Sequence, residues 1–131
     1  MNAFFPIAAK SALIDFIASR PLKAALFTEK AQLAEKTSRY SAEGELSGPG
    51  YDAGGLPLTV SSKGIDAGNV AYLGFANPTW TNASFIGARY LEIYDSETLT
   101  TYGVIDFGAE KSGQGADFTY KFPAKGGVIR I

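Results

Sequence analysis

Apolar and aromatic residues are concentrated between residues 80 and 107. Their pattern predicts two strands, over residues 84–94 and 102–107, joined by a polar turn over residues 95–101. Bulky side chains fall on both sides of the first strand. A strand with one face in water alternates apolar and polar residues, so we expect this strand to lie centrally in a sheet and to be covered on both faces.

Two charged residues, Arg89 and Glu92, interrupt the first of these strands and need a partner or a route to water. Asp106 lies between Ile105 and Phe107 in the second strand and therefore faces away from them. The pattern makes Arg89 a cross-strand partner for Asp106. A structural ion pair is favoured over a catalytic role for this aspartate.

Residues 3–18 form the most hydrophobic segment of the chain, but Lys10 and Asp15 interrupt it and it is too short to span a membrane. No positive charge precedes the apolar run and no convincing cleavage site follows, so a signal peptide is not expected.

Ala9, Leu13 and either Phe16 or Ile17 recur at helical spacing, and Pro21 requires a helix to end before it. One interpretation is a short amphipathic helix packed on its own domain. The alternative is an arm that reaches onto a neighbouring subunit.

The remainder of the chain alternates short apolar runs with turn-forming residues. Residues 44–55 are rich in glycine and predict a structured crossing loop, with Tyr51 fixing it to the sheet. Residues 108–116 predict a long flexible turn. The other expected strands cover residues 22–28, 56–61, 70–75, 118–122 and 128–131.

This spacing predicts a mostly β fold, a single β-sandwich of jelly-roll or immunoglobulin-like type with a short N-terminal helix or arm. We expect residues 1–21 to form the apolar helix or arm and residues 22–131 to form the sandwich domain.

The amino-acid composition excludes several kinds of catalytic and metal site. The chain has 131 residues, 46% of them hydrophobic, with no cysteine and no histidine. Disulfides, Cys/His zinc sites and Ser–His or Cys–His nucleophile pairs are excluded. The net charge of −1 gives no basic field for nucleic acid. Residues 1–40 carry six basic and three acidic side chains (+3) and residues 41–131 carry six and ten (−4), a distribution that also suits a basic arm on an acidic neighbour.

Candidate chemical motifs are weak. The glycine-rich loop lacks the GK[ST] ending of a P-loop, and no EF-hand spacing is present. Turn capping and solvation account for nearly all the carboxylates. We therefore assign no catalytic residue, no metal ligand and no cofactor.

Several segments in order resemble a known family: LKAALFT, SGPGYDAGGLPL, WTNASFIGARYLEIYD, GVIDFG and GADFTYKFPAKGGVIRI. Over residues 22–131 the chain is similar to small virion structural proteins of tailed bacteriophages. The resemblance rests on a loop like G-x-GY-x-AGG-x-x-L, a segment like W-x-x-A-x-x-x-ARY-x-x-x-Y, an IDFG-like strand and a terminal GxF…G-[VI] hairpin. Their order is more specific than any one of them.

The resemblance implies a non-enzymatic part of a phage particle, assembled in the host cytoplasm. A capsid decoration or cement protein that bridges major capsid subunits on the head surface is preferred. A tail, neck or fibre-attachment component is the first alternative, and a carbohydrate-binding or hydrolytic virion domain is the second.

Partners would be the major capsid protein or other virion proteins, with homo-oligomers expected and no nucleic acid or membrane. Residues 1–21 lie outside the resemblance and are expected to hold the contact. The anchors would be Phe4, Phe5, Ile7, Leu13, Phe16 and Ile17, with Lys10, Arg20 and Lys23 meeting acidic groups at the rim.

Overall fold

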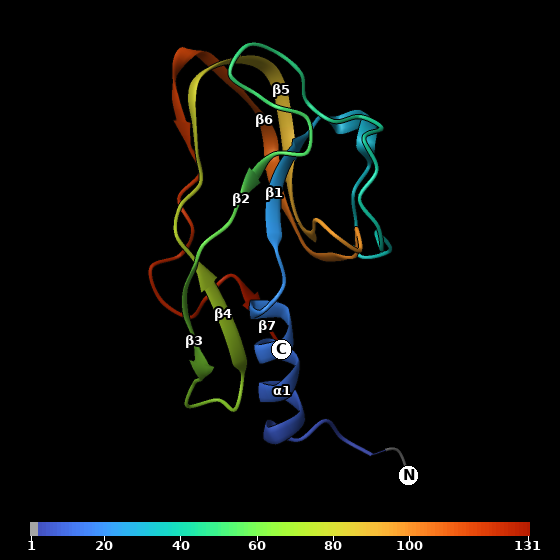
Figure 1. Ribbon diagram of the computed structural model, residues 1–131, viewed down its shortest axis with the longest axis vertical. Coiled ribbons are helices and arrows are strands. Elements are labelled where there is room, and N and C mark those ends of the chain that lie inside the picture. The colour runs from blue at the N-terminus through green and yellow to red at the C-terminus, as the bar shows by residue number, and fades with distance from the viewer. Residues whose placement is uncertain (1–2) are drawn as a thin grey trace. The chain divides into compact units, whose positions relative to one another are not determined.

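The computed structural model describes residues 3–131, and Figure 1 labels the helices and strands of this part of the chain. The elements are α1 (Ile7–Ala18), β1 (Leu22–Phe27), the 3₁₀-helix η1 (Glu29–Ala31), β2 (Leu56–Pro57), β3 (Val60–Ile65), β4 (Ala71–Phe75), β5 (Thr79–Asp95), β6 (Thr101–Thr119) and β7 (Ile129–Arg130).

The strands form two antiparallel sheets, with orders β2-β1-β5-β6 and β3-β4-β7. The prediction of a mostly β fold with a short N-terminal helix is confirmed, and the two antiparallel sheets are consistent with a β-sandwich.

The sheets belong to two compact units. The helix unit comprises the described residues up to Arg20, residues 59–76 and residues 121–131, and it holds α1, β3, β4 and β7. The four-stranded unit comprises residues 21–58 and 77–120. The predicted boundary after residue 21 lies beside the first junction between the units, whereas residues 59–76 and 121–131 are grouped with the helix.

Strand β5 organises the four-stranded unit, as the sequence predicts. Its last six residues, from Tyr90 to Asp95, are all buried, so both faces of the strand are covered. This stretch pairs with β1 on one side, where Leu91 faces Leu26, and with β6 on the other, where Leu91 faces Ile105. Burial on both faces requires apolar side chains at odd and even positions, which explains the absence of alternation in the sequence.

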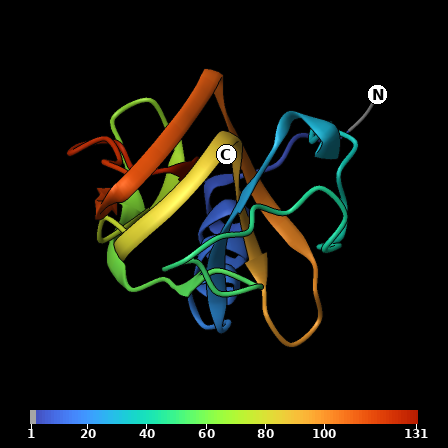
Figure 2. The same ribbon diagram turned by 90° about the horizontal axis from the view of Figure 1, so that it is seen from above.

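The prediction of a flexible turn over residues 108–116 is wrong. These residues belong to β6, which runs beside β5 for its whole length and pairs Phe85 with Gly113 (Figures 1 and 2). The register shifts at several points, and Gly108 and Gly115 adopt positive φ there, as residues at β-bulges do. The residues are polar because they are mostly exposed, and cross-strand pairing with β5 compensates for their low strand propensity.

The glycine-rich loop is structured, as predicted. Tyr51 fixes it to the sheet: its hydroxyl oxygen accepts a hydrogen bond from the Leu26 amide at 2.9 Å, and its ring stacks on Trp80. Gly55 adopts φ +81°, and a Cβ at this position would collide with the carbonyl oxygen of Ala24. Only glycine fits so close to β1.

The helix unit is built on α1, which packs against β3 and β4. Pro6 precedes the helix and its carbonyl accepts the first helical hydrogen bonds. Two residues of the helix itself, Ile14 and Ile17, are buried. Elsewhere in the helix unit, Arg130 binds Asp66 at 2.6 Å, and Phe75 packs on Phe122. The interpretation of this segment as a helix packed on its own chain is therefore confirmed.

Candidate interaction surface

Helix α1 carries apolar residues on two faces. At 3.6 residues per turn, Ala9, Ala12, Leu13 and Phe16 fall within an arc of about 100°. Ile14 and Ile17 lie outside that arc and are buried against the unit's own strands. Figure 1 shows β3 and β4 on one side of α1 and, among the described residues, no element of the same unit on the opposite side. The helix thus has an inner face and an outward face, both apolar.

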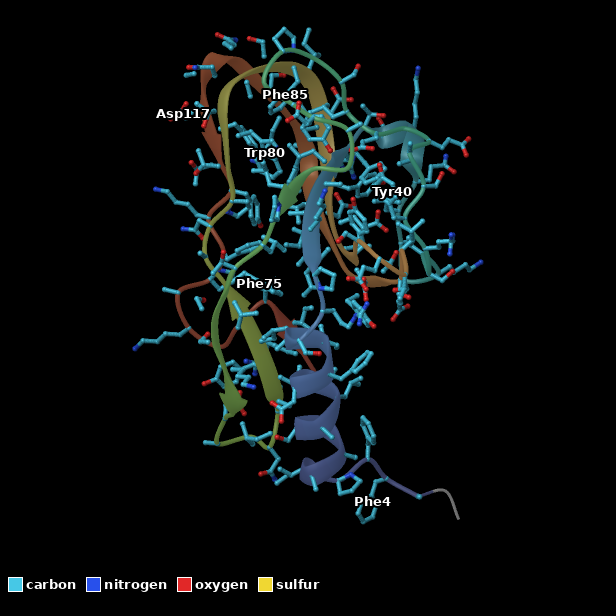
Figure 3. The ribbon with its side chains drawn as sticks, in the orientation of Figure 1. Phe4, Tyr40, Phe75, Trp80, Phe85 and Asp117 are labelled. Atoms are coloured by element: carbon cyan, nitrogen blue, oxygen red, sulfur yellow. The ribbon has the colours of Figure 1, made fainter. Side chains whose placement is uncertain are left out.

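The segment before the helix adds further exposed apolar groups. Residues 3–6 are non-helical, and Phe4 extends beyond the first turn of the helix in Figure 3. We define the N-terminal apolar surface as the five large apolar side chains of this region that are exposed, with their exposed fractions: Phe4 (88%), Phe5 (54%), Ile7 (44%), Leu13 (37%) and Phe16 (53%).

This surface is unusual in its size and in its lack of charge. Added together, the five exposed side chains present about 500 Å² of apolar area, with Ile7 and Phe16 on opposite sides of the helix. The two charged side chains between residues 3 and 18 contact their own unit: Lys10 Nζ donates to the Asn69 carbonyl at 3.2 Å, and Asp15 pairs with Lys63 at 2.9 Å. The exposed apolar residues of α1 are therefore flanked by charges that are already paired within the unit.

Of the nine residues predicted for the contact, five are large apolar side chains that the structure leaves exposed. The prediction of Ile17 as an anchor is wrong, because this side chain is buried within the helix unit and cannot contact a partner. Lys10 is turned to the Asn69 carbonyl and Arg20 is half-buried. Lys23 lies in β1 of the four-stranded unit. Helical spacing identifies the apolar positions but not which of them face inward.

The four-stranded unit contains a cluster of one carboxylate, Glu45, and three tyrosines that sequence reasoning missed. Glu45 accepts hydrogen bonds from the hydroxyls of Tyr40 and Tyr51 and from the Gly54 amide, the last at 2.7 Å. Tyr40 stacks on Tyr94 with ring centroids 4.3 Å apart. Burial, with a contribution from the Glu45 charge, raises the pKa of Tyr51 above its ordinary range and that of Tyr94 to about 12. The tyrosines stay protonated, and the cluster fastens the glycine-rich loop.

Two carboxylates of the β5–β6 pair also have structural roles. Asp106 pairs with Arg89 at 2.7 Å, so the predicted ion pair is confirmed, and the hydrogen bond from Arg89 lowers the aspartate pKa. Glu92 is fully buried: Oε2 accepts a hydrogen bond from the Thr101 hydroxyl at 2.6 Å, and Oε1 has no partner among the described residues. Desolvation raises the Glu92 pKa.

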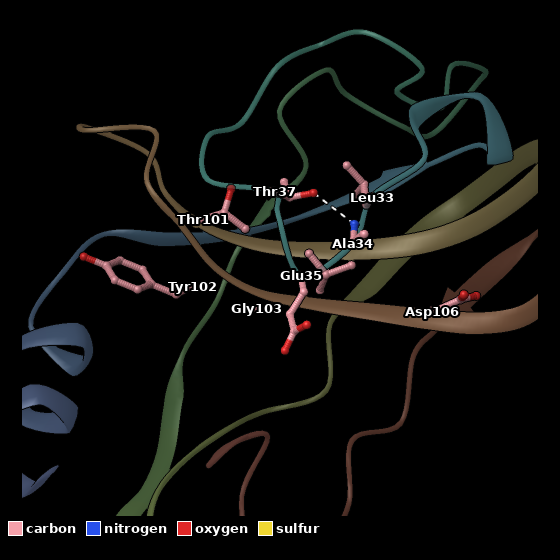
Figure 4. A pocket seen from close by; sticks show the side chains of 9 residues that line it. Leu33, Ala34, Glu35, Thr37, Thr101, Tyr102, Gly103 and Asp106 are labelled. Atoms are coloured by element: carbon pink, nitrogen blue, oxygen red, sulfur yellow. Dashed lines mark hydrogen bonds between the residues drawn. The ribbon is translucent and has the colours of Figure 1, made fainter. Parts of the chain in front are cut away.

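A hollow of about 540 Å³ lies between the loop after η1 and the start of β6 (Figure 4). Two residues that line it are joined by a hydrogen bond from the Ala34 amide to Thr37 Oγ1. Of its two acidic residues, Glu35 and Asp106, the second is already paired with Arg89. Within residues 3–131 no three potential metal-binding side chains cluster, so this hollow shows no ligand set for an ion.

Comparisons with family models, with curated proteins and with solved structures each find no match. The resemblance to phage virion proteins stays a prediction. Across the described residues, no helix has the length and apolar character needed to cross a bilayer.

Proposed function

We propose that the protein is a non-enzymatic structural component of a tailed-bacteriophage virion, a decoration protein that binds the major capsid lattice on the head. The observation that carries this proposal is the N-terminal apolar surface, which its own unit does not cover and which lies in the region outside the family resemblance. Several large apolar side chains left exposed in one region support a protein contact there.

The mechanism is the addition of interface free energy over a repeated lattice. Each contact of about 500 Å² per partner is at the lower limit for a specific interface. Weak contacts of this kind become effective when one particle offers many sites and when the bound molecule has more than one attachment point. Phe4 and Phe5 are the leading anchors because aromatic side chains contribute most to interface energies.

The arrangement of carboxylates supports a binding role over a hydrolytic one. Glu92 is sealed in the sheet and Asp106 is held by Arg89, so neither is placed to transfer a proton to a substrate. The proposal therefore includes no catalytic step.

The test uses purified heads that lack the protein. The double variant Phe4→Ser/Phe5→Ser removes two exposed anchors without touching α1, so the fold is expected to be unchanged. At about 1.5–3 kcal/mol for each fully buried anchor, the variant should bind heads about a hundredfold or more weakly. Ile86→Ser is the matched control, because Ile86 is 84% exposed but lies in β5.

Equal binding by the double variant and the control would contradict the proposed contact. Electron cryomicroscopy of particles with and without the protein then assigns its location: density on the outer head surface supports the proposal, and density only on the tail or neck overturns it.

A further inference from the structure

The segment between β1 and the glycine-rich loop, residues 28–41, forms a cap on the four-stranded unit. It packs on the buried aromatic cluster around Phe27 through three half-buried side chains, Ala31, Leu33 and Tyr40. None of residues 28–41 is itself buried. A segment with so few buried contacts is the part of a folded unit that opens at the lowest free energy.

The far end of the cap is fastened to the turn between β5 and β6. The Tyr40 amide donates to the Leu99 carbonyl at 2.8 Å, and the Thr101 amide donates to the Ser38 carbonyl at 3.1 Å. Leu99 and Gln32 both have left-handed backbone, with φ of +65° and +50°, a conformation that favours glycine. The closed cap therefore holds a strained residue on each side of its contact with the sheet.

The cap does not seal the sheet along β6. The hollow of about 540 Å³ in Figure 4 lies at this seam, with Leu33 and Thr37 of the cap on one side and Thr101 and Val104 of β6 on the other. This volume is far more than one water molecule needs. Water therefore reaches the edge of the covered face while the cap is closed.

Glu92 lies one side chain inward from this hollow. In the strand register it stands between Val104 of β6 and Ala25 of β1. Thr101, which lines the hollow, donates its hydroxyl hydrogen to Glu92 Oε2 at 2.6 Å, and Oε1 has no partner among the described residues. The carboxyl group is fully buried, but only the cap and the Thr101 side chain separate it from solvent.

No basic side chain balances a charge at this position. The titratable groups on the same face of β5 and in the segments packed on that face are acidic or phenolic: Tyr40, Glu45, Tyr90 and Tyr94. The charged residues of the cap itself are all exposed: Glu29, Lys30, Glu35, Lys36 and Arg39. Arg89, whose guanidinium lies over the Tyr90 ring, is paired with Asp106.

We infer that Glu92 and the cap form a pH-sensitive latch, in which the cap closes over the protonated carboxyl group and opens along β6 when that group ionises. An ionised Glu92 would be buried with one hydrogen bond and no counter-charge, which costs free energy. Strands β1 and β6 are held to β5 by strand pairing, so the cap is the cover that lifts most readily.

The direction of the pH response follows from the surroundings of Glu92. Burial, with a contribution from Glu45, raises the pKa of Glu92 above its ordinary value of 4.5, against the Thr101 hydrogen bond. The cap is therefore closed at acid pH and opens as the pH rises through the folded-state pKa. Opening breaks the hydrogen bonds of the Tyr40 and Thr101 amides and leaves the sheet paired. The latch does not depend on the proposed function.

Hydrogen exchange between pH 4 and pH 9 tests the latch, with rates expressed as protection factors to remove the intrinsic pH dependence of exchange. The Tyr40 and Thr101 amides are the reporters, because their hydrogen bonds join the cap to the turn. In the wild-type protein their protection should fall at least tenfold as the pH rises. The Leu58 amide, which donates to the Leu22 carbonyl at 2.9 Å outside the cap, should keep its protection.

Three variants isolate the group that titrates. Glu92→Gln keeps the side-chain size and cannot ionise, so the Tyr40 and Thr101 amides should stay protected throughout. Glu110→Gln removes an exposed carboxylate of β6 and is the matched control, which should behave as wild type. Thr101→Val removes the hydroxyl that favours the ionised form of Glu92, so the cap should open at a higher pH than in wild type.

Four results would overturn the latch. The first is protection at Tyr40 and Thr101 that does not change with pH in the wild-type protein. The second is an equal loss at Leu58, which would indicate unfolding of the whole unit. The third is a wild-type response in Glu92→Gln, because another group would then titrate. The fourth is a Thr101→Val variant that opens at the same or a lower pH.

Discussion

Strand β5 and helix α1 have the same sequence character and opposite outcomes. Both are apolar on two faces. In β5, residues 90–95 are buried on both faces, between β1 and β6 and beneath the loops of their own unit. In α1, Ile14 and Ile17 are buried while Leu13 and Phe16 remain exposed. The chain itself buries both apolar faces of β5 but only one apolar face of α1.

The difference separates core from interface. A chain buries apolar groups because their exposure to water costs free energy. An apolar face that the folded unit leaves open, with no charge across it, retains that cost until another molecule covers it. We attribute the inner residues of α1 to folding and its outward residues to association.

The largest effect is expected at the doubly covered strand. Leu91→Ala removes a fully buried side chain from the centre of the larger sheet, and the cavity should lower the free energy of unfolding by about 2–5 kcal/mol. Urea denaturation measures this change. A loss below 1 kcal/mol would mean that β5 is less tightly enclosed than described.

Two adjacent residues of α1, one buried and one exposed, should differ in how much stability is lost when each is replaced by alanine. Ile17→Ala is expected to cost about 2–3 kcal/mol of local stability, because Ile17 is buried, and Phe16→Ala about 1 kcal/mol or less. Hydrogen exchange of the α1 and β4 amides reports both. Equal losses of protection would remove the distinction between the inner and outward faces.

A pH-dependent effect is expected at Glu92. Burial raises its pKa above the ordinary value of 4.5, so the folded protein holds this proton more tightly than the unfolded chain. Its contribution to stability is present below pH 4.5 and is lost as the pH rises through the folded-state pKa. Glu92→Gln cannot titrate, so its stability relative to wild type should increase between pH 4 and pH 7. A difference that is independent of pH would show that the Glu92 pKa is not raised.

The smallest effect is expected at an exposed apolar residue outside both regions. Ile86→Ser should change the free energy of unfolding by no more than about 0.5 kcal/mol. It should also leave head binding unchanged. A clear loss of head binding would place a second contact on the β5–β6 pair.

The sequence predicts those features that local chemistry determines. The apolar run of β5 follows from bulky residues at both odd and even positions, the turn before β6 from its polar turn residues, and the pairing of Arg89 with Asp106 from their positions in neighbouring strands. Tyr51 is predicted as the anchor of its loop because a bulky aromatic among glycines has little other use.

Other features depend on distant partners and escape the pattern. Residues 108–116 read as a turn because they are polar and glycine-rich, and they form a strand because β5 lies beside them. Ile17 reads as an outward anchor because helical spacing does not state which side meets β3 and β4. The Glu45 cluster joins side chains of a loop whose path the sequence leaves open.

The most direct test of the account is the accessibility of the outward face before and after assembly. Ala12→Cys places a thiol on that face while keeping Phe16, and Ile86→Cys places one on an exposed strand as reference. Under reducing conditions, a bulky maleimide should label both thiols readily in dilute protein. In the head-bound protein, position 12 should become protected at least tenfold and position 86 should not. Unchanged labelling of position 12 in the assembled state would contradict the claim that another chain covers this face.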